Sequence, residues 1–148
     1  MKEPALDIVG AGPSGLSAAI AARARGLEVT VYEKRPDVGA RFHGDFQGLE
    51  NWTSKTDVLA ELEGMGIQTQ FDHTPIYEIV CLSADGASHT VRASEPIFYL
   101  LRRGPLPGTL DQALKAQALA AGVAIHFDER QRQISGGSIV ADGPHRAD

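Results

Sequence analysis

The 148-residue sequence predicts an α/β fold in which a parallel βαβ sheet is interrupted by a small antiparallel insertion. Three patterns indicate this fold: a strand–helix–strand order at the amino terminus, short strand-like pieces in the middle, and a later helix followed by an apolar strand. The first strand is predicted at residues 5–9. This short apolar run stops at Gly10 and is typical of a buried strand.

A helix and a second strand complete the first unit. Residues 13–25 carry apolar residues at helical spacing, while Pro13 suits the first turn and Gly26 suits a carboxy-terminal cap. Residues 28–33 are rich in β-branched and aromatic residues and follow after a two-residue gap. The two strands must therefore be parallel and joined by a right-handed crossover.

The middle of the sequence predicts a long loop, a helix and an antiparallel section. Residues 34–53 contain three glycines and few apolar positions, so we expect an ordered loop with a function of its own. A helix is predicted over about residues 54–63. Strands are predicted at residues 67–71, 76–82, 89–93 and 96–102, with an Asp85–Gly86 turn between the second and the third.

The last third of the sequence predicts a return to the parallel sheet. Thr109 and Gln112 are the ends of a capping box that opens a helix reaching Ala121, and Gly122 closes that helix. Residues 123–127 are expected to form another buried parallel strand. Two short strand candidates follow, at residues 131–134 and 138–141.

Composition and charge exclude several functions. The 14 Lys and Arg against 19 Asp and Glu give a net charge of −5, which argues against a nucleic-acid binder because that function needs a basic face. The single cysteine, Cys81, excludes an internal disulfide, a Cys-x-x-Cys zinc site and a redox pair, so redox chemistry would need an external cofactor. No stretch has the pattern of a transmembrane segment or a signal peptide, and the predicted location is cytoplasmic.

The most specific pattern is the glycine-rich turn between the first strand and the first helix, Gly10-Ala-Gly-Pro-Ser-Gly15. Gly10 permits a tight turn, and Gly15 lets the helix pack close to the sheet. Gly12 removes a side chain where a pyrophosphate would approach the backbone. The amino terminus of the helix adds N–H groups and the positive end of its dipole, so the pattern indicates a dinucleotide site.

Glu33, at the end of the second strand, fits the same site because its carboxylate can accept hydrogen bonds from a ribose diol. NAD(P), FAD and S-adenosylmethionine all use a glycine turn with an acid at this place, so the pattern leaves the nucleotide open. Lys34 and Arg35 could receive a 2′-phosphate, but Glu33 would repel it, and NADP is disfavoured. The alternative for the two cations is a solvated turn.

The run Asp7-Ile-Val-Gly-Ala-Gly-Pro-Ser-Gly-Leu-Ser-Ala-Ala, followed by Val31-Tyr-Glu-Lys-Arg and Val38-Gly-Ala-Arg41, resembles the amino-terminal FAD-binding part of flavoprotein oxidoreductases of the glutathione-reductase-like fold. The most similar branch is that of the geranylgeranyl reductase-like flavoprotein dehydrogenases, and aromatic-ring hydroxylases are more distant. Residues 41–52, 101–104 and 109–123 support this branch.

The resemblance implies a Rossmann-like FAD/NAD(P)-binding domain with FAD as cofactor and NAD(P)H as a candidate electron donor. The glycine turn would face the FAD pyrophosphate, and the acid at the end of the second strand would face the adenosine ribose. The residues implied in these two places are Gly10, Gly12, Pro13, Ser14, Gly15, Glu33 and Lys34.

Two arginines are implied as further cofactor contacts. Arg41 would lie near the phosphates or the ribityl chain. Arg103 would match a flavin-contacting arginine, and Arg102 is an equal rival for that role. For both Arg41 and Arg103 the alternative is a surface cation.

The resemblance also has departures. Such flavoproteins are typically more than twice as long, so residues 1–148 are interpreted as a truncated FAD/NAD(P)-binding domain in which about residues 67–102 belong to an incomplete substrate domain. Ala141-Asp-Gly143 lies where relatives have an Ala-Thr-Gly-like or Asp-Gly motif. The expected partners are a small-molecule substrate of unknown identity and either a second copy of the chain or a missing carboxy-terminal half.

Three functions therefore stay open: an FAD-dependent oxidoreductase, an NAD-dependent dehydrogenase or reductase, and a non-catalytic nucleotide-binding remnant. No residue is assigned as catalytic. The five histidines lack the spacing of metal ligands, so no metal site is predicted, and His126 is interpreted as a residue of a strand. Cys81 is expected in the core. Phe42, Phe46 and Trp52 are expected to pack the long loop against the protein, and the alternative is that they cover a flavin or a substrate.

Overall fold

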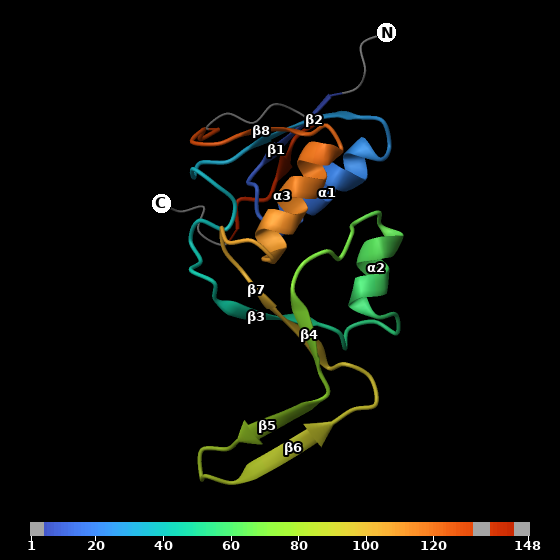
Figure 1. Ribbon diagram of the computed structural model, residues 1–148, viewed down its shortest axis with the longest axis vertical. Helices are drawn as coiled ribbons and strands as arrows, with labels where there is room; N and C mark the ends of the chain where they lie inside the picture. Colours follow the sequence, from blue (N-terminus) through green and yellow to red (C-terminus); the bar gives the residue numbers. More distant parts are fainter. Residues whose placement is uncertain (1–4, 132–136, 144–148) are drawn as a thin grey trace.

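The computed structural model describes residues 5–131 and 137–143, and its long axis runs from a parallel sheet at one end to a β-hairpin at the other (Figure 1). Its elements in chain order are β1 (Ala5–Val9), α1 (Pro13–Arg23), β2 (Glu28–Tyr32), β3 (Phe46–Glu50), α2 (Val58–Gly64), β4 (His73–Ile76), β5 (Glu78–Leu82), β6 (Ser88–Arg92), β7 (Phe98–Arg102), α3 (Leu110–Ala120), β8 (Ala124–His126) and β9 (Ile139–Val140).

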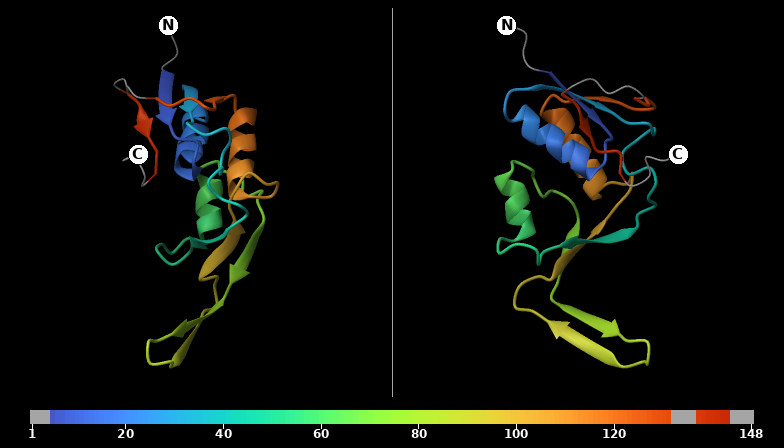
Figure 2. Two further views of the ribbon diagram at one scale, coloured as in Figure 1. Left: turned by 90° about the vertical axis from the view of Figure 1, so that its left-hand side faces the viewer. Right: turned by 180° about the vertical axis from the view of Figure 1, so that it is seen from behind.

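The parallel sheet has the strand order β8-β2-β1-β9, and each neighbouring pair is parallel. β1 and β2 pair along their whole length, from Ala5 opposite Glu28 to Val9 opposite Tyr32. α1 and α3 lie side by side on one face of this sheet (Figure 2). The predicted α/β class and the βαβ unit at the amino terminus are therefore confirmed.

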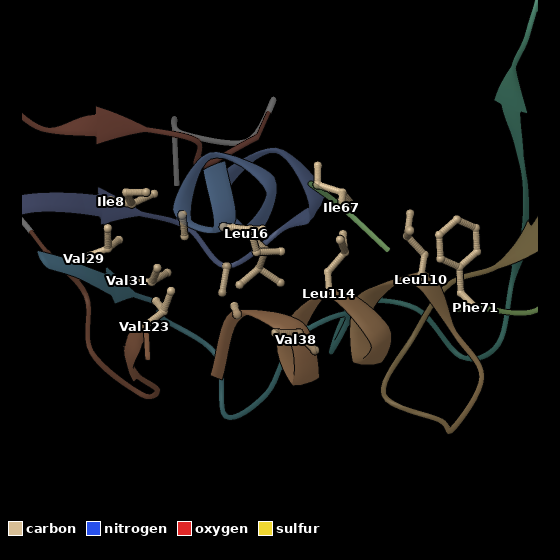
Figure 3. Close-up of a cluster of buried hydrophobic side chains, with 14 of the residues drawn as sticks. Ile8, Leu16, Val29, Val31, Val38, Ile67, Phe71, Leu110, Leu114 and Val123 are labelled. Atoms are coloured by element: carbon tan, nitrogen blue, oxygen red, sulfur yellow. The ribbon is translucent and has the colours of Figure 1, made fainter. Parts of the chain in front are cut away.

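The hydrophobic core lies between that face of the sheet and the two helices (Figure 3). Ile8 of β1, Val31 of β2 and Leu16 of α1 are fully buried, and Leu114 of α3 closes the cluster from the other side. Val38, from the segment after β2, is buried in the same cluster. Because side chains alternate along a strand, one face of each strand supplies this core.

The predicted ends of α1 and α3 agree with the structure within two residues. α1 ends at Arg23 rather than at residue 25. At the start of α3 the Thr109 hydroxyl accepts a hydrogen bond from the Gln112 backbone N–H (3.4 Å), and after its end Gly122 has a φ of +82°. The Gln112 side chain does not complete the capping box, because it donates to Asp37 instead (3.0 Å).

The predicted antiparallel section is also present, as a three-stranded sheet of order β3-β7-β4 and a separate β5–β6 hairpin. The Asp85–Gly86 turn joins β5 to β6, and Gly86 has a φ of +85°. The predicted strand at residues 76–82 is in fact two strands in different sheets. β4 ends at Ile76 and pairs with β7, whereas β5 begins at Glu78 and pairs with β6.

Two predictions in this region are wrong. The long loop at residues 34–53 contains β3, whose sequence has a weak strand signal of its own and which is held by β7. Residues 67–71, predicted as a strand, are irregular. Ile67 and Phe71 insert into the core from this irregular segment. The apolar residues that predicted a strand therefore reflect burial and not strand structure.

Three expectations of burial are wrong as well. The strand predicted at residues 123–127 forms β8 and pairs with β2, but it is an edge strand whose Ala124 and His126 are exposed. Cys81 lies on the exposed hairpin rather than in the core. Phe46 and Trp52 are exposed and do not pack the loop against the protein.

The carboxy-terminal part returns to the parallel sheet at β9, which pairs with β1 through Ile139 and Val140 and confirms the candidate strand at residues 138–141. The other candidate strand, at residues 131–134, falls mostly outside the described residues. None of the helices in the described part of the chain has the length and apolar character needed to span a bilayer.

Candidate functional site

The glycine turn joins β1 to α1 at the carboxyl end of the sheet. Gly10 has a φ of +102°, and a Cβ added there would lie 2.5 Å from the carbonyl oxygen of Ala141. A Cβ added at Gly15 would lie 1.9 Å from the carbonyl oxygen of Gly10. Both glycines are therefore required by the packing of the protein itself, as the sequence predicted.

Gly12 differs from these two glycines. Its φ is −76°, which any residue adopts, and a Cβ added there would meet no atom within 4 Å. The fold therefore gives no reason for glycine at this position, whereas a ligand approaching the backbone does. Gly12 is also the N-cap of α1 with no side-chain cap, so the first N–H groups of the helix have no intrahelical partner. Pro13 occupies the first turn, and Ser14 is exposed.

Glu33 follows β2 and holds the turn in place. One carboxylate oxygen, Oε2, accepts a hydrogen bond from the Ala11 N–H (2.9 Å), and the other, Oε1, accepts one from the Arg35 N–H (2.9 Å). Each oxygen keeps a second lone pair that can accept from another donor. Glu33 therefore has a structural role that the sequence did not predict, and it keeps the capacity to bind a diol.

A cleft of about 420 Å³ opens at the carboxyl ends of β1, β2 and β9. Ligands of open parallel α/β sheets bind at this edge, at the point where the chain passes to opposite sides of one strand. Here β2 and β9 lie on opposite sides of β1. The residues that line it are Gly10, Ala11, Gly12, Pro13, Ser14, Glu33, Lys34, Arg35, Asp37, Gly39, Ala40, Arg41, Phe42, Arg103, Asp111, Ala141, Asp142 and Gly143. The structure thus brings together every predicted cofactor-binding residue except Gly15, which lies just behind the turn and is buried.

The two predicted arginines have different environments. Arg41 is exposed at the cleft, with its guanidinium carbon 4.6 Å from the centre of the Phe42 ring. Arg103 is buried and lies 4.4 Å from the centre of the same ring. The Arg103 Nε and Nη2 atoms donate to both oxygens of Asp111, at 2.8 and 2.9 Å, and its Nη1 donates to Gln47.

The alternative of a surface cation is therefore wrong for Arg103, because its side chain is the centre of a buried ion pair. The rival Arg102 does not line the cleft, since it points to the other side of β7 and pairs with Asp72 (3.1 Å). Asp111 also accepts from the Gly104 N–H (2.9 Å) and so fixes the chain where β7 ends. Phe42, half-buried between the two guanidinium groups, holds the wall of the cleft.

Several residues of the cleft were missed as site residues from the sequence. Asp111 lies in the segment that opens the predicted helix and supports the family resemblance, but no sequence signal predicts its pairing with an arginine eight positions earlier. Asp142 was noted only within the Ala-Asp-Gly motif, and β9 places it beside the glycine turn. Asp37 gave no signal at all. Within the described residues, no group of three or more His, Cys, Asp or Glu could hold a metal ion.

Asp37 forms a partly buried polar contact between the loop after β2 and α3. Burial by itself would raise the pKa of this carboxyl, but the hydrogen bonds from Lys115, the Val38 N–H and Gln112 outweigh burial, so its pKa lies below the usual value. Asp37 therefore stays ionised at neutral pH and is a permanent partner for the Lys115 ammonium (2.7 Å).

The comparisons with known proteins are consistent with this geometry. A family model described as an NAD(P)-binding Rossmann-like domain matches residues 8–49, which include the glycine turn, Glu33 and Arg41. A comparison with curated proteins finds no match.

Three solved structures are similar over most of the chain. A tetrameric form of 2-methyl-3-hydroxypyridine-5-carboxylic acid oxygenase is 26% identical, with a TM-score of 0.66, over 86% of this chain and 32% of its own. A geranylgeranyl bacteriochlorophyll reductase-like protein from Thermoplasma acidophilum is 20% identical, with a TM-score of 0.68, over 95% and 40%. CtdE, solved in complex with FAD, is 21% identical, with a TM-score of 0.52, over 87% and 31%.

The chain therefore spans between 31% and 40% of the length of these structures. The likeness at 20% and 21% identity shows a shared fold. The structures that share it include an oxygenase, a reductase-like protein and a protein solved with FAD, and the amino-terminal part of the chain matches a Rossmann-like NAD(P)-binding domain.

Proposed function

We propose that this chain is the FAD-binding amino-terminal portion of a flavin-dependent oxidoreductase. The observation that carries the proposal is the open space at Gly12, which faces the amino terminus of α1 inside a cleft at the carboxyl ends of parallel strands. Backbone N–H groups and the helix dipole at that point suit a diphosphate. The complex of CtdE with FAD, which has the same fold, supports FAD as the dinucleotide.

The residues of the glycine turn have two different proposed roles. Gly10 and Gly15 bring turn, helix and sheet together, and Gly12, Pro13 and Ser14 leave space and N–H groups for the diphosphate. These roles follow from the backbone geometry of the turn.

The ends of the dinucleotide would contact side chains. Glu33 would accept from the adenosine ribose while holding Ala11 and Arg35, and Lys34 lies beside it. Arg41, exposed and supported by Phe42, would contact the phosphates or the ribityl chain. Arg103 would act on the cofactor through the wall it builds with Asp111 and Phe42, because three of its nitrogens already donate within the protein.

FAD, when bound, supplies hydride and electron transfer, and the chain supplies its position and its electrostatic surroundings. The assignment to a geranylgeranyl reductase-like branch of a glutathione-reductase-like fold is part of this proposal and is supported by coverage of 95% of the chain by such a protein. The substrate is a small molecule of unknown class, and NAD(P)H is the proposed electron donor. Residues 67–102 are proposed to contribute to a substrate domain, apart from Ile67, Phe71 and Leu101, which pack in the core of the nucleotide-binding part.

The second candidate is an NAD-dependent dehydrogenase or reductase. The specific observation in its favour is the match of residues 8–49 to a domain described as NAD(P)-binding. The geometry of Glu33 suits the adenosine ribose of NAD as well as that of FAD. A non-catalytic nucleotide-binding module is the third candidate.

The experiment is a visible spectrum of the purified chain after incubation with excess FAD and desalting, followed by titration with NAD. We expect retained flavin bands in the unaltered chain and loss of most of them in Gly12→Val, because that side chain enters the space proposed for the diphosphate. Gly12 has φ and ψ values of −76° and 176°, which valine tolerates, so circular dichroism should show an intact fold.

Glu33→Ala is the second variant, with Glu28→Ala as its matched control. Glu28 is exposed at the start of β2, far along the strand from the cleft. A folded chain that takes no flavin but binds NAD would favour the second candidate. A folded chain that binds neither nucleotide would favour the non-catalytic module.

A further inference from the structure

The loop after β2 is joined to α3 by a group of three side chains. The Asp37 Oδ1 atom accepts from the Lys115 ammonium (2.7 Å) and from the Val38 N–H (2.7 Å), and its Oδ2 atom accepts from the Gln112 amide (3.0 Å). Gln112 and Lys115 are three positions apart on α3 and therefore lie on one face of the helix. The side chains of Asp37 and Lys115 are 33% and 21% exposed, which makes this pair better shielded than a surface ion pair.

This group lies at the start of one wall of the cleft. Residues 37 and 39–42 all line the cleft, and Val38 between them is buried in the core against α3. Gly39 lies against the backbone of Gly104, since a Cβ added there would be 2.7 Å from the Gly104 carbonyl carbon. The Phe42 N–H donates to the Gly39 carbonyl (2.8 Å), so the wall is a tight turn fixed first at Asp37.

The charge of Asp37 matters because of its position. A carboxylate at the edge of a space for a diphosphate would repel that ligand unless a cation neutralised it. Asp111, the buried carboxylate of the same cleft, is neutralised by Arg103. Lys115 does the same for Asp37 from the side of α3.

We infer that Lys115 is a positioning residue for the nucleotide: through Asp37 it holds the wall formed by residues 37–42, and it cancels a negative charge in the cleft proposed to receive the anionic nucleotide. The effect on nucleotide affinity rests on the proposed function. The bracing of residues 37–42 rests only on contacts within this chain. Lys115 does not line the cleft, and it would nevertheless affect the affinity for the nucleotide.

Two measurements test it, on Lys115→Met, Asp37→Asn, the double variant and Lys115→Arg. The first is the dissociation constant for FAD, followed by quenching of flavin fluorescence. We expect Lys115→Met to weaken binding by about tenfold, because an uncompensated carboxylate then lines the cleft that receives the anionic nucleotide. Asp37→Asn should weaken it by about threefold or less, since only the brace is lost.

The double variant separates charge from mere structure. If Lys115 acts by neutralising Asp37, adding Asp37→Asn to Lys115→Met restores the affinity to that of Asp37→Asn alone. A double variant that binds FAD as weakly as Lys115→Met, or a Lys115→Met protein that binds like the unaltered chain, would overturn the inference. Lys115→Arg keeps the cation and should stay within about twofold of the unaltered chain.

The second measurement is hydrogen exchange of the Val38 and Phe42 amides in the protein without nucleotide. Lys115→Met and Asp37→Asn should each speed exchange there and leave the amides of α1 unchanged. Arg92→Met, which removes an ion pair on the β5–β6 hairpin, is the matched control and should change neither measurement. Absence of FAD binding in the unaltered chain would contradict the proposed function. Unchanged exchange at Val38 and Phe42 would contradict the brace, whether or not FAD binds.

Discussion

β2 and β5 are two five-residue strands of similar sequence in very different surroundings. β2 reads Glu-Val-Thr-Val-Tyr and β5 reads Glu-Ile-Val-Cys-Leu. Val31 of β2 is 0% exposed, because its face of the parallel sheet is covered by α1 and α3. Val80 of β5 is 57% exposed on a hairpin that projects from the rest of the molecule (Figure 1).

The difference between the parallel sheet and the β5–β6 hairpin teaches that strand propensity and burial are separate properties. β-branched and aliphatic residues favour both strands. α1 and α3 pack over the parallel sheet, so its strands become part of the hydrophobic core, to which β5 and β6 contribute none of the described residues. The candidate site follows the same division, because its residues lie around the carboxyl ends of the parallel sheet and none of the residues that line the cleft belongs to the hairpin.

The largest expected difference in the free energy of unfolding is between substitutions at two glycines, one in each region. Gly15→Ala would place a Cβ 1.9 Å from the Gly10 carbonyl oxygen, so we expect a loss of more than about 4 kcal/mol in the free energy of unfolding, or no folded protein. Gly86→Ala, at a φ of +85° with open space around it, should cost only about 1 kcal/mol. Urea unfolding measures both variants, and equal losses would contradict the comparison.

The ion pairs of the two regions should differ nearly as much. Asp111→Ala leaves the buried Arg103 guanidinium without its carboxylate, which should cost about 3 kcal/mol or more. Glu78→Ala removes the partner of Arg92 on the exposed hairpin and should cost less than about 0.5 kcal/mol. Thermal unfolding of both variants at low salt is the measurement. A costly Glu78→Ala would mean that the hairpin is packed in solution.

The two valines test burial directly. Val31→Ala opens a cavity in the core beneath α1 and α3 and should cost about 2 to 3 kcal/mol. Val80→Ala removes a half-exposed side chain and should stay within about 0.5 kcal/mol of the unaltered chain. A loss at Val80 comparable to that at Val31 would show that its face of the hairpin is covered by something other than the described residues.

The smallest effect is expected in the three-stranded sheet between the two regions, where Tyr99 of β7 donates to Asp57, the N-cap of α2 (2.6 Å). This hydrogen bond raises the pKa of Tyr99 to about 12, with a further contribution from burial. For Asp57, burial would raise the pKa, but hydrogen bonds from Tyr99, backbone N–H groups and Asn51 lower it below the usual value.

The directions of these two pKa shifts predict that the free energy of unfolding falls at alkaline pH (the alkaline limb) and at acid pH (the acid limb). The stability from Tyr99 is present below pH 10 and is lost as the pH rises toward 12, because deprotonation removes the donor. The stability from Asp57 is present above the ordinary aspartate pKa and is lost as the pH falls through its lowered folded value. Tyr99→Phe should cost about 1 kcal/mol at pH 7, remove the share of the alkaline loss of stability that Tyr99 supplies, and weaken the acid loss of stability. Unfolding curves between pH 3 and pH 11 that match the unaltered chain would contradict this.

The sequence by itself determined the βαβ unit, the caps of α3, the turn of the hairpin and the glycine turn with Glu33. Each of these depends on residues near one another in the chain: glycines where a positive φ or a close approach is needed, an acid at a strand end, a threonine before a helix. These steric and hydrogen-bonding requirements involve residues only a few positions apart, so a short stretch of sequence is enough to predict them.

Only the tertiary structure decided which apolar residues are buried and which polar residues meet. Ile67 and Phe71 reach the core from an irregular segment, whereas Cys81 is exposed on a strand of high apolar content. Asp37 meets Lys115 across 78 positions, and β9 brings Asp142 to the glycine turn. Such contacts depend on how helices return over a sheet and on loop packing, which no local pattern encodes.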